Sequence, residues 1–495
     1  MVSKAYDMVV VGAGCAGLAA ALQAAQCGLS VAVVEKAAAI GGAADGGHGL
    51  FAVGSHLQRD RQVPLSVDQA FRFFMDFTHW RVDAQLMSAY VRKSADTVAW
   101  LERIGIRFLD VVSYFPGAHQ TWHFKDPESP KITDALWQNA KALGAELLVD
   151  TAADGVVLEQ GRVCGLRVRD AQGGTRLLPA ATVVIATGGF SGNAEWVQRH
   201  LGYRVGVDAF PFDLPAMVGD GIRIAWEAGA APSEMTIDAY VCMPPPYHGP
   251  GGTTFELGSF RQPNLMVNAQ GVRFMNEEVM ANPGFAANAV HRQPDGCGFM
   301  LFDAATHAAY VERGWDVVMS KLPVTRPDAF EQRVAEARAG GYRHLFVADS
   351  LAELAAQMDI PEPPLQATVD RYNAACDSGR DAEFFKSAER LRPLRHGPFY
   401  AARFYIGGYG GLGGIRINHR TEVLGRSGDT IEGLYAAGND ANALFGDTYP
   451  FAMSGNASSF CFNTGRIAAE QAAALVRGRQ GASSQPIAAT VANAS

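Results

Sequence analysis

The chain has few cysteines, and their positions exclude several kinds of redox centre. None of the seven belongs to a CxxC pair, so the sequence predicts no zinc, iron–sulfur or c-type haem site. Their odd number and wide spacing are typical of reduced thiols in a cytoplasm. The cysteines are Cys15, Cys27, Cys164, Cys242, Cys297, Cys376 and Cys461.

Long apolar runs and runs of one charge are also missing. No apolar stretch is long enough to span a bilayer, and the N-terminal "MVSKAYDMVVVGAG" is too short for the core of a signal peptide. The formal net charge is −8 without a Lys/Arg run, which argues against a nucleic-acid partner. With 48% hydrophobic and 19% charged residues, the 495-residue chain is predicted to be a soluble, cytoplasmic, multidomain protein without a metal site.

Glycine is abundant, with 54 residues, and the first glycine cluster follows a predicted strand. Met8–Val11 is a short β-branched run that is typical of a buried parallel strand. Gly12, Gly14 and Gly17 then form a G-x-G-x-x-G turn. The first glycine permits the tight turn, the second lets the backbone approach a pyrophosphate, and the third allows close helix–strand packing.

A helix and a second strand complete this unit. The helix is predicted from Cys15 to about Cys27, and its N-terminal amides can face phosphate groups. The strand in "LSVAVVE" ends at Glu35, whose carboxylate can accept a hydrogen bond from a ribose hydroxyl. Glycine turns also occur for packing alone, but the complete order of strand, turn, helix, strand and acid favours a dinucleotide, either FAD or NAD.

Later glycines favour FAD over NAD. A second glycine-rich loop follows Glu35, with Gly41, Gly42, Gly46, Gly47 and Gly49. Such a loop suits a cofactor that continues past its pyrophosphate into a bulky isoalloxazine ring. A buried strand also precedes Thr187 and Gly188, and "EGLYAAGND" repeats the strand-then-glycine pattern at Gly438.

Further motifs are spread along the chain in a specific order. They include "VVIATGGF", "GDGIRIAWEAGA", "LMVNAQGVRFMNEE", "GGLGGIRIN", "GLYAAGND" and "FNTGRIAAE". In this order the chain resembles the fumarate reductase / 3-ketosteroid dehydrogenase flavoprotein family over nearly its whole length. The resemblance implies an α/β fold, in which a Rossmann-like FAD-binding domain (1–232 and 405–480) is interrupted by a smaller α+β capping domain (233–404). A flexible C-terminal tail is expected at 481–495.

The resemblance also implies a set of FAD contacts. They are Gly12, Gly14, Gly17, Glu35, Lys36, Gly41, Gly42, Asp220 and Gly438. Asn439 replaces an acid that usually binds the ribityl chain, and an amide can still hydrogen-bond a hydroxyl. Asn456, Ala457 and Ser458 match positions near the flavin pyrimidine, where a helix N-terminus would stabilise negative charge on the reduced flavin. His48 could be a covalent flavin tether as in succinate dehydrogenases, but "DGGHGLF" does not match their tether segment and favours packing near the cofactor.

Several departures from the family concern the dicarboxylate site. A small dicarboxylate is held by guanidinium groups, but Ala452 and Ala281 stand where the two expected arginines would be. Met243 replaces the histidine before a proline, and Tyr409 and Gly410 replace a pair of histidines. The sequence therefore predicts that fumarate and succinate are not substrates.

Tyr449-Pro450 resembles the Tyr-Pro pair with which ketosteroid dehydrogenases hydrogen-bond the substrate carbonyl. That branch's base-bearing tyrosine after "NE" is absent, since Ala281 and Asn282 occupy its place. A tyrosine can act as acid or base if a neighbouring donor lowers its pKa of ~10. The candidates are Tyr449, Tyr240, Tyr247, Tyr114, His119 and His248.

These residues predict an FAD-dependent oxidoreductase that adds or removes hydrogen across a C–C bond adjacent to a carbonyl. It would be an ene-reductase or a desaturase acting on a neutral, non-dicarboxylate substrate, with an unidentified electron donor or acceptor. The alternative is a flavoprotein electron-transfer subunit of a larger redox complex, which the missing haem and iron–sulfur cysteines disfavour. A flavin monooxygenase is a third option, disfavoured because no second convincing G-x-G-x-x-G is present.

Overall fold

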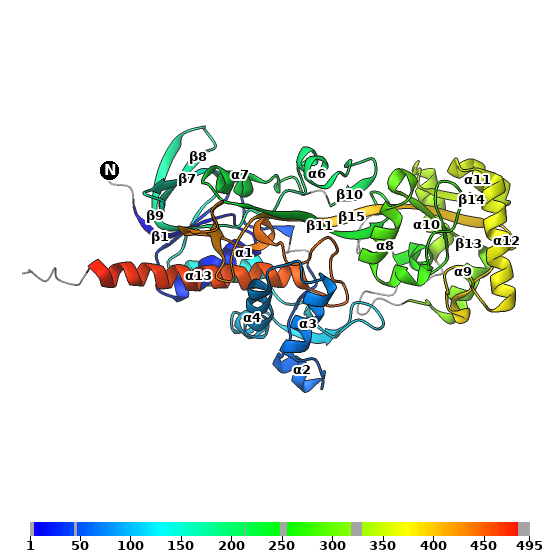
Figure 1. The fold of residues 1–495 in the computed structure, drawn as a ribbon, viewed down its shortest axis with the longest axis horizontal. Coiled ribbons are helices and arrows are strands. Elements are labelled where there is room, and N and C mark those ends of the chain that lie inside the picture. The colour runs from blue at the N-terminus through cyan, green and yellow to red at the C-terminus, as the bar shows by residue number, and fades with distance from the viewer. Residues whose placement is uncertain (1–3, 44–46, 213, 248–254, 318–328, 484–495) are drawn as a thin grey trace, which may run out of the picture.

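The computed structural model describes residues 4–43, 47–212, 214–247, 255–317 and 329–483. Two lobes are visible, joined by the long strands β11 (Pro232–Cys242) and β15 (Phe399–Ile415) (Figure 1). The predicted α/β fold class, a Rossmann-like FAD-binding fold with a second, smaller lobe, is confirmed.

The larger lobe is built on an eight-stranded sheet. Its strands are β1 (Tyr6–Val11), β2 (Val31–Val34), β6 (Glu146–Leu148), β7 (Thr151–Glu159), β8 (Arg162–Asp170), β9 (Thr175–Ile185), β16 (Glu422–Leu424) and β17 (Thr430–Ala436). The order is β16-β17-β8-β9-β1-β2-β6, with β7 paired to β8. Strand β1 is parallel to both β2 and β9. The first two strands were predicted from the sequence, and their buried, β-branched residues are typical of a parallel sheet.

Helices cover this sheet, and a small three-stranded sheet lies beside it. The helices are α1 (Cys15–Gln26), α2 (His56–Asp60), α3 (Val67–Phe77), α4 (Ala84–Arg103), α5 (Ile132–Ala142), α6 (Ala194–Leu201), α7 (Asp220–Glu227), the 3-10 turn η7 (Gly438–Ala441) and α13 (Asn456–Ser483). The small sheet has the order β3 (Gly49–Phe51), β5 (Trp122–Lys125), β4 (Phe108–Val112). Helix α1 is buried along most of its length, and its alanines allow α13 to pack closely alongside (Figure 1).

The smaller lobe is built around the N-terminal part of β15. Its remaining strands are β10 (Ala209–Pro211), β12 (Leu265–Val267), β13 (Gly298–Asp303) and β14 (Leu345–Ala348). Its helices are α8 (Pro283–His291), α9 (Ala304–Arg313), α10 (Phe330–Ala339), α11 (Leu351–Met358) and α12 (Glu362–Ser378), with 3-10 turns η2 (Phe255–Arg261), η3 (Glu277–Ala281), η4 (Pro294–Gly296) and η6 (Ala388–Arg390). Together with β11 and β15, these strands form a second sheet. In it β11, β13 and β14 each pair antiparallel with β15.

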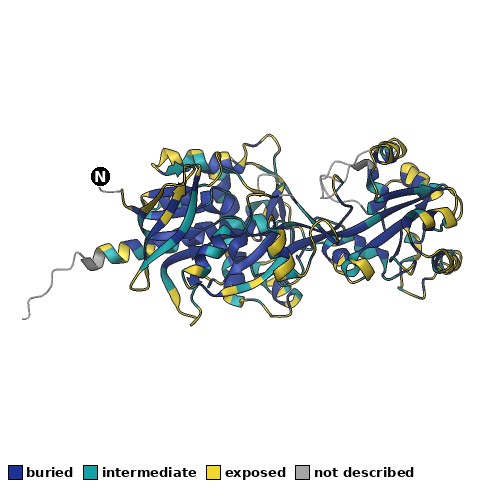
Figure 2. Ribbon diagram, turned by 90° about the horizontal axis from the view of Figure 1, so that it is seen from above, coloured by how far each residue is buried: buried dark blue, intermediate teal, exposed yellow. Residues whose placement is uncertain are grey.

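The paired strands β11 and β15 belong to both lobes. Tyr240 and Cys242 of β11 belong to the hydrophobic core of the larger lobe, whereas Ile237, Ala239 and Val241 belong to that of the smaller lobe. This alternation follows from the two-residue period of a strand. Burial is continuous along the two strands where they pass between the lobes (Figure 2).

The expected domain boundaries fall on these shared elements. The boundary at 232/233 coincides with the start of β11, and that at 404/405 falls inside β15. Helix α13 continues to Ser483, so the first three residues of the expected tail, 481–483, are helical. The rest of that expected tail, 484–495, lies outside the described residues.

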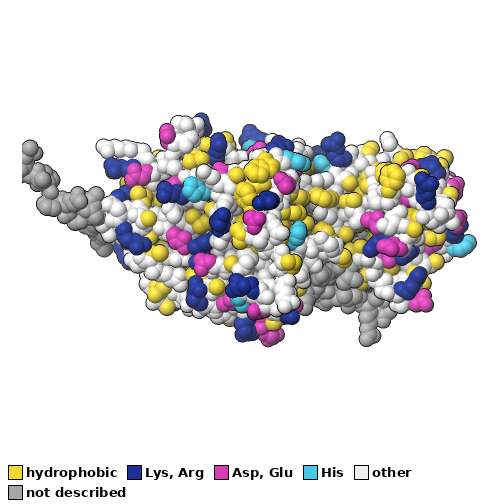
Figure 3. All heavy atoms as spheres, turned by 60° about the horizontal axis from the view of Figure 1, so that its bottom comes forward, with side chains coloured by type: hydrophobic (Ala, Val, Ile, Leu, Met, Phe, Trp, Pro, Cys, Tyr) yellow, Lys and Arg dark blue, Asp and Glu magenta, His cyan; other side chains and the backbone are white. Residues whose placement is uncertain are grey.

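A helix that crosses a membrane must be both long and apolar. No helix within the described ranges is both long enough and apolar enough to cross a bilayer. On the face drawn in Figure 3, Lys and Arg side chains lie interspersed with Asp and Glu side chains. The expected absence of a nucleic-acid partner stays a prediction.

A buried ionic network fixes the "RFMNEE" segment of the smaller lobe. The Arg273 guanidinium donates two hydrogen bonds of 2.8 Å to the Glu277 carboxylate and one of 2.8 Å to Asp381. The Lys386 ammonium lies 3.3 Å from Glu277, and all four side chains are at most 1% exposed. Glu277 therefore has a structural role. Its ion pairs with Arg273 and Lys386 fix the start of the 3-10 turn η3.

Replacing Arg273 by methionine is expected to lower the free energy of unfolding by about 3–5 kcal/mol, because buried carboxylates lose their main partner. The matched control is Arg371→Met. The Arg371 side chain is 54% exposed and lies 3.8 Å from Glu383, and an exposed pair of this kind contributes about 0–1 kcal/mol. Urea unfolding followed by circular dichroism measures both. Equal losses in the two variants would contradict a stabilising role for the network.

Candidate active site

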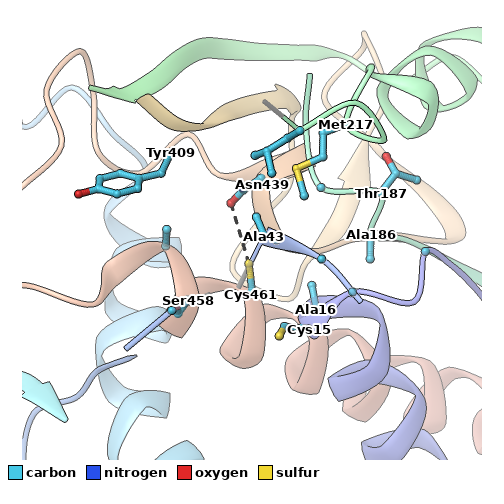
Figure 4. A pocket seen from close by; sticks show the side chains of 18 of the residues that line it. Cys15, Ala16, Ala43, Ala186, Thr187, Met217, Tyr409, Asn439, Ser458 and Cys461 are labelled. Carbon is cyan, nitrogen blue, oxygen red and sulfur yellow. Dashed lines mark hydrogen bonds between the residues drawn. The ribbon is translucent and has the colours of Figure 1, made fainter. Parts of the chain in front are cut away.

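One cavity of about 730 Å³ runs between the glycine turn that follows β1 and the middle of β11 and β15. Fifteen of the predicted cofactor residues line it: Gly12, Gly14, Glu35, Lys36, Gly41, Gly42, Gly47, Gly49, Thr187, Gly188, Asp220, Gly438, Asn439, Ala457 and Ser458. Figure 4 shows Cys15 and Ala16 at the start of α1 on one side, and Tyr409 at the opposite end. Residues far apart in the sequence are thus brought around one elongated space.

The first glycine turn is shaped for a backbone that passes close to other groups. Gly12 has φ +103°, and a Cβ there would lie 2.3 Å from the Ala186 carbonyl oxygen. A Cβ on Gly17, which does not line the cavity, would lie 1.9 Å from the Gly12 carbonyl oxygen. Gly14 immediately precedes α1, whose first amides face a bound pyrophosphate in this kind of unit. These contacts require glycine for the reasons that the motif predicts.

The Glu35 carboxylate lines the cavity beside the first glycine turn. One oxygen accepts a hydrogen bond of 2.8 Å from the Ala13 amide, and the other accepts one of 2.9 Å from the Ala37 amide. A carboxylate has about four lone-pair positions, so it can still accept a ribose hydroxyl. Lys36 donates a hydrogen bond of 2.8 Å to Asp220, at the first turn of α7. The donor and acceptor set therefore fits the adenosine half of FAD.

A buried carboxyl group that was not predicted from the sequence, Asp440, holds the glycine turn at Thr187–Gly189. Asp440 is fully buried and accepts hydrogen bonds from the Thr187 amide, from the Thr187 hydroxyl at 3.0 Å and from the Gly189 amide at 2.8 Å. Burial raises the pKa of Asp440, and these donors oppose the shift. The neighbouring Asn439 lines the cavity, and its side-chain oxygen accepts a weak hydrogen bond from the Cys461 thiol at 3.9 Å (Figure 4). The family pattern places an acid at position 439. In this chain Asn439 occupies that position, and the neighbouring acid, Asp440, holds the turn at Thr187.

The N-terminus of α13 reaches the cavity and holds Tyr449. The Ala457 amide donates a hydrogen bond of 3.0 Å to the Tyr449 phenol oxygen. Asn456 is turned away from the cavity, and its side-chain oxygen accepts a hydrogen bond of 3.0 Å from the Tyr90 hydroxyl. Tyr449 lines the cavity and is only 8% exposed. A tyrosine oxygen that accepts one amide still has its own proton to donate.

Burial raises the pKa of Tyr449, with the Asp238 charge adding to the shift and the amides of α13 opposing it. The lowered pKa on which a role of Tyr449 as a base would depend is therefore absent. Tyr449 is a neutral phenol at ordinary pH, suited to donating a hydrogen bond.

Aromatic rings form the wall beside Tyr449. Tyr114 lines the cavity, shares a hydrogen bond with Tyr409, and packs on Phe451 with a centroid distance of 5.4 Å. Tyr240 packs behind Tyr409 at 4.6 Å and is not among the described residues that line the cavity. Its hydroxyl is buried and has no hydrogen-bond partner in the described part of the chain.

The other sequence candidates lie elsewhere. Tyr247 packs against Tyr342 at 4.8 Å, and the His119 ring packs against Phe73 at 5.2 Å. His248 lies outside the described residues. His48 lines the cavity, where burial lowers its pKa, and its ring stacks on Phe124 at 6.1 Å. This stacking agrees with the interpretation of His48 as a residue that packs near the cofactor.

A second buried carboxyl missed by sequence reasoning, Asp238, also lines the cavity. It is 2% exposed, and its Oδ1 accepts a hydrogen bond of 2.5 Å from the Gly410 amide. Burial raises the pKa of Asp238 to about 8, although backbone amides oppose the shift. In the sequence Asp238 stands in "TIDAYVCM", which matches none of the motifs that identify the cofactor site.

Cations are scarce around this cavity. Of the described residues that line it, Lys36 is the only Lys or Arg, and its ammonium pairs with Asp220 at 2.8 Å. Within the described ranges, no group of three or more His, Cys, Asp or Glu side chains is placed to hold a metal ion. The substrate end thus offers phenols, apolar rings and one carboxyl.

Comparisons with known proteins agree with this geometry. The chain matches the FAD binding domain family over residues 7–456. It is 34% identical to the vinyl phenol reductase of Lactiplantibacillus plantarum, over 94% of this chain and 96% of that protein. It is 28% identical to the NADH:fumarate oxidoreductase of Klebsiella pneumoniae over 96% of this chain, but spans only 48% of that longer protein.

Among solved structures, the fold is similar to that of a 3-ketosteroid Δ1-dehydrogenase from Sterolibacterium denitrificans. The TM-score is 0.75 at 21% identity, covering 95% of this chain and all of that one. At this identity the likeness concerns the fold alone. Family match, sequence identity and cavity together show that the chain is an FAD-dependent oxidoreductase of the fumarate reductase / 3-ketosteroid dehydrogenase type and belongs to the FAD binding domain family.

Proposed function

We propose that the enzyme adds or removes hydrogen across a C–C bond adjacent to a carbonyl in a neutral, flat molecule, and that Tyr449 binds the substrate oxygen. The observation that carries the proposal is the Tyr449 phenol, which accepts a helix amide at 3.0 Å and lines the cavity. Bound FAD supplies hydride transfer, and the protein positions the substrate and handles the proton.

The hydrogen bond from α13 makes Tyr449 a better donor. An amide that donates to the phenol oxygen stabilises negative charge there, and the positive end of the helix dipole adds to this effect. Reduction of a conjugated double bond moves negative charge onto the carbonyl oxygen. A fixed O–H aimed at that oxygen therefore stabilises the transition state more than the ground state.

The composition of the cavity supports a neutral substrate. The wall around Tyr449 consists of Tyr114, Phe212, Tyr409 and Phe451. Aromatic faces pack well against a planar conjugated molecule. The vinyl phenol named for the similar Lactiplantibacillus enzyme and a ketosteroid are both uncharged molecules that combine an oxygen function with an oxidisable or reducible C–C bond. The chain is therefore expected to accept a molecule of this class.

An anaerobic substrate panel tests the proposal. The purified enzyme is reduced with dithionite and mixed with cyclohexenone, cinnamaldehyde, a vinyl phenol or fumarate, while flavin absorbance is followed. At least one of the two neutral carbonyl compounds, cyclohexenone and cinnamaldehyde, is expected to reoxidise the flavin much faster than fumarate. Reoxidation by none of them, together with co-purification of an iron–sulfur protein, would favour the electron-transfer subunit instead.

A cytoplasmic location is part of the proposal. None of the seven cysteines, all of which lie in the described ranges, forms a disulfide, as in proteins of a reducing compartment. The partner that supplies or removes electrons is expected to be a small molecule or a second protein that approaches the cavity.

The flavin is expected to be bound without a covalent link. His48 stacks on Phe124, and "DGGHGLF" does not resemble a tether segment. Precipitation with acid or heat should release all of the yellow flavin into the supernatant. Flavin that stays in the protein pellet would contradict this expectation, and His48→Ala would then show whether the link is at His48.

A further inference from the structure

We propose that Asp238 is the group that gives a proton to the substrate carbon during reduction, in a role separate from that of Tyr449. This inference rests on the proposed function, because it assigns the second hydrogen of the same reaction. It arises from an irregularity in the sheet where the two lobes meet.

A β-bulge places the Asp238 carboxyl in the cavity. Ile237 is opposite Gly411 and Ala239 is opposite Gly408, so Tyr409 and Gly410 together face the single residue Asp238. A bulge of this kind bends the strand and redirects a side chain. The extra residue leaves backbone amides unpaired in the ladder, and the Asp238 carboxyl accepts them from Gly410 at 2.5 Å and from Tyr409.

The absence of a side chain at Gly410 leaves room for Asn439 beside this arrangement. A Cβ at Gly410 would lie 3.0 Å from the Asn439 side-chain nitrogen, which is tighter than ordinary van der Waals contact. The glycine that stands in place of a family histidine therefore brings its amide to the Asp238 carboxyl and leaves room for Asn439. The histidine pair has been exchanged for an aromatic ring, Tyr409, and a buried acid.

The proton of the neutral carboxyl belongs on Oδ2, because Oδ1 accepts the Gly410 amide. The carboxyl is 2% exposed, and burial holds its pKa at about 8. At neutral pH most molecules therefore carry this proton. A general acid transfers its proton best when its pKa lies near the working pH, and Asp238 meets this condition better than a phenol of raised pKa.

Apart from Arg261, the titratable groups near Asp238 are neutral at this pH. Tyr240 on its own strand, Tyr409 on β15, Tyr449 before α13 and Cys461 on α13 each feel the Asp238 charge. Burial raises the pKa of all four groups. The charge of Arg261 in η2 acts on Tyr240 and thus lies nearby. Asp238 is therefore the group of this cluster that titrates near neutral pH.

The hydrogen count balances with these two residues. Reduction of the double bond requires one hydride, with its two electrons, and one proton. Reduced FAD is the hydride source in this family of oxidoreductases. The Oδ2–H bond of Asp238 breaks and a C–H bond forms at the carbon next to the carbonyl, leaving a carboxylate that takes a proton from water before the next cycle. Tyr449 keeps its proton and donates a hydrogen bond to the carbonyl oxygen.

Asp238→Asn tests this role. The amide oxygen can still accept the Gly410 and Tyr409 amides, so flavin content is expected to be unchanged. With the panel compound that reoxidises the wild-type flavin fastest, kcat should fall roughly 100-fold or more while KM changes little. The matched control is Asp303→Asn, a 1% exposed carboxyl in the smaller lobe that caps α9 and should keep the wild-type rate.

Two readouts do not depend on that variant. The wild-type rate should fall as the pH rises through about 8, because the proton is lost there. Infrared spectra of the oxidised protein should show a protonated-carboxyl C=O band that disappears over the same pH range and is missing in Asp238→Asn. A wild-type rate that stays constant from about pH 6 to about pH 9.5, or an Asn variant with wild-type kcat, would overturn the assignment.

The two proposals fail in different ways. If no neutral compound reoxidises the reduced wild type, the proposed function is wrong. If one does and Asp238→Asn is equally fast, the function stands and Asp238 is not the proton donor.

Discussion

Replacing Tyr449 by phenylalanine is expected to lower the rate of flavin reoxidation by the best neutral substrate roughly 100-fold or more, without loss of the flavin. The hydroxyl is the only group removed. FAD is expected to be held mainly by the glycine turns, Glu35 and Asp220 at the other end of the cavity. In the wild type the Tyr449 ring packs against Phe451 and Phe445, with centroid distances of 4.8 and 5.4 Å. The phenylalanine ring of the variant is expected to keep both contacts.

The measurement is a single-turnover experiment under anaerobic conditions. The reduced variant is mixed with substrate, flavin absorbance is followed, and the oxidised spectrum is recorded to confirm full flavin content. The control is Tyr310→Phe, since the Tyr310 hydroxyl is also buried but donates to Asn264 at 2.7 Å inside the smaller lobe. That variant is expected to lose stability and to keep its rate.

A Tyr449→Phe variant with wild-type turnover would show that the substrate oxygen is bound elsewhere. Tyr114 would be examined next, because it also lines the cavity. The loss should be nearly independent of pH, since burial raises the pKa of Tyr449 and the phenol stays protonated. This distinguishes it from Asp238, whose contribution is expected to depend on pH.

The N-terminal half of the cofactor site could be predicted from the sequence because its parts are local. The strand, glycine turn, helix, strand and Glu35 lie within 30 residues, and each glycine has a steric reason that the motif states. The predicted helix from Cys15 to about Cys27 is observed as Cys15–Gln26, one residue shorter. Local motifs of this kind determine their own geometry.

The acid groups at the substrate end could not be predicted, because they depend on pairing between distant strands. Asp238 is directed by a bulge that forms only when β11 pairs with β15, more than 160 residues later in the chain. Asp440 is used by the turn at Thr187, about 250 residues earlier. Tyr240 was a reasonable candidate by type, but its position behind Tyr409 follows from the same register. Neither residue type nor spacing reveals such long-range contacts.

Fumarate is expected to reoxidise the reduced enzyme slower than its neutral dimethyl ester by at least two to four orders of magnitude. The ester needs no cationic partner, whereas each fumarate carboxylate that leaves water without one loses several kcal/mol, and a total of about 3–6 kcal/mol corresponds to roughly two to four decades. Ala452 and Ala281 provide no such partner, and the only Lys or Arg among the described cavity residues, Lys36, pairs with Asp220 at the far end. As Asp238 loses its proton above about pH 8, the resulting carboxylate would repel a dicarboxylate further.

The ester isolates the effect of charge, since the two compounds share the same conjugated double bond and nearly the same shape. Both are mixed at millimolar concentration with the dithionite-reduced enzyme, and the rates of flavin reoxidation are compared. The ratio should increase as the pH is raised from about 6 to about 9, because the like charge of Asp238 develops over this range. Equal rates for fumarate and its ester would mean that cations outside the described cavity residues bind the carboxylates, and the neutral-substrate proposal would be wrong.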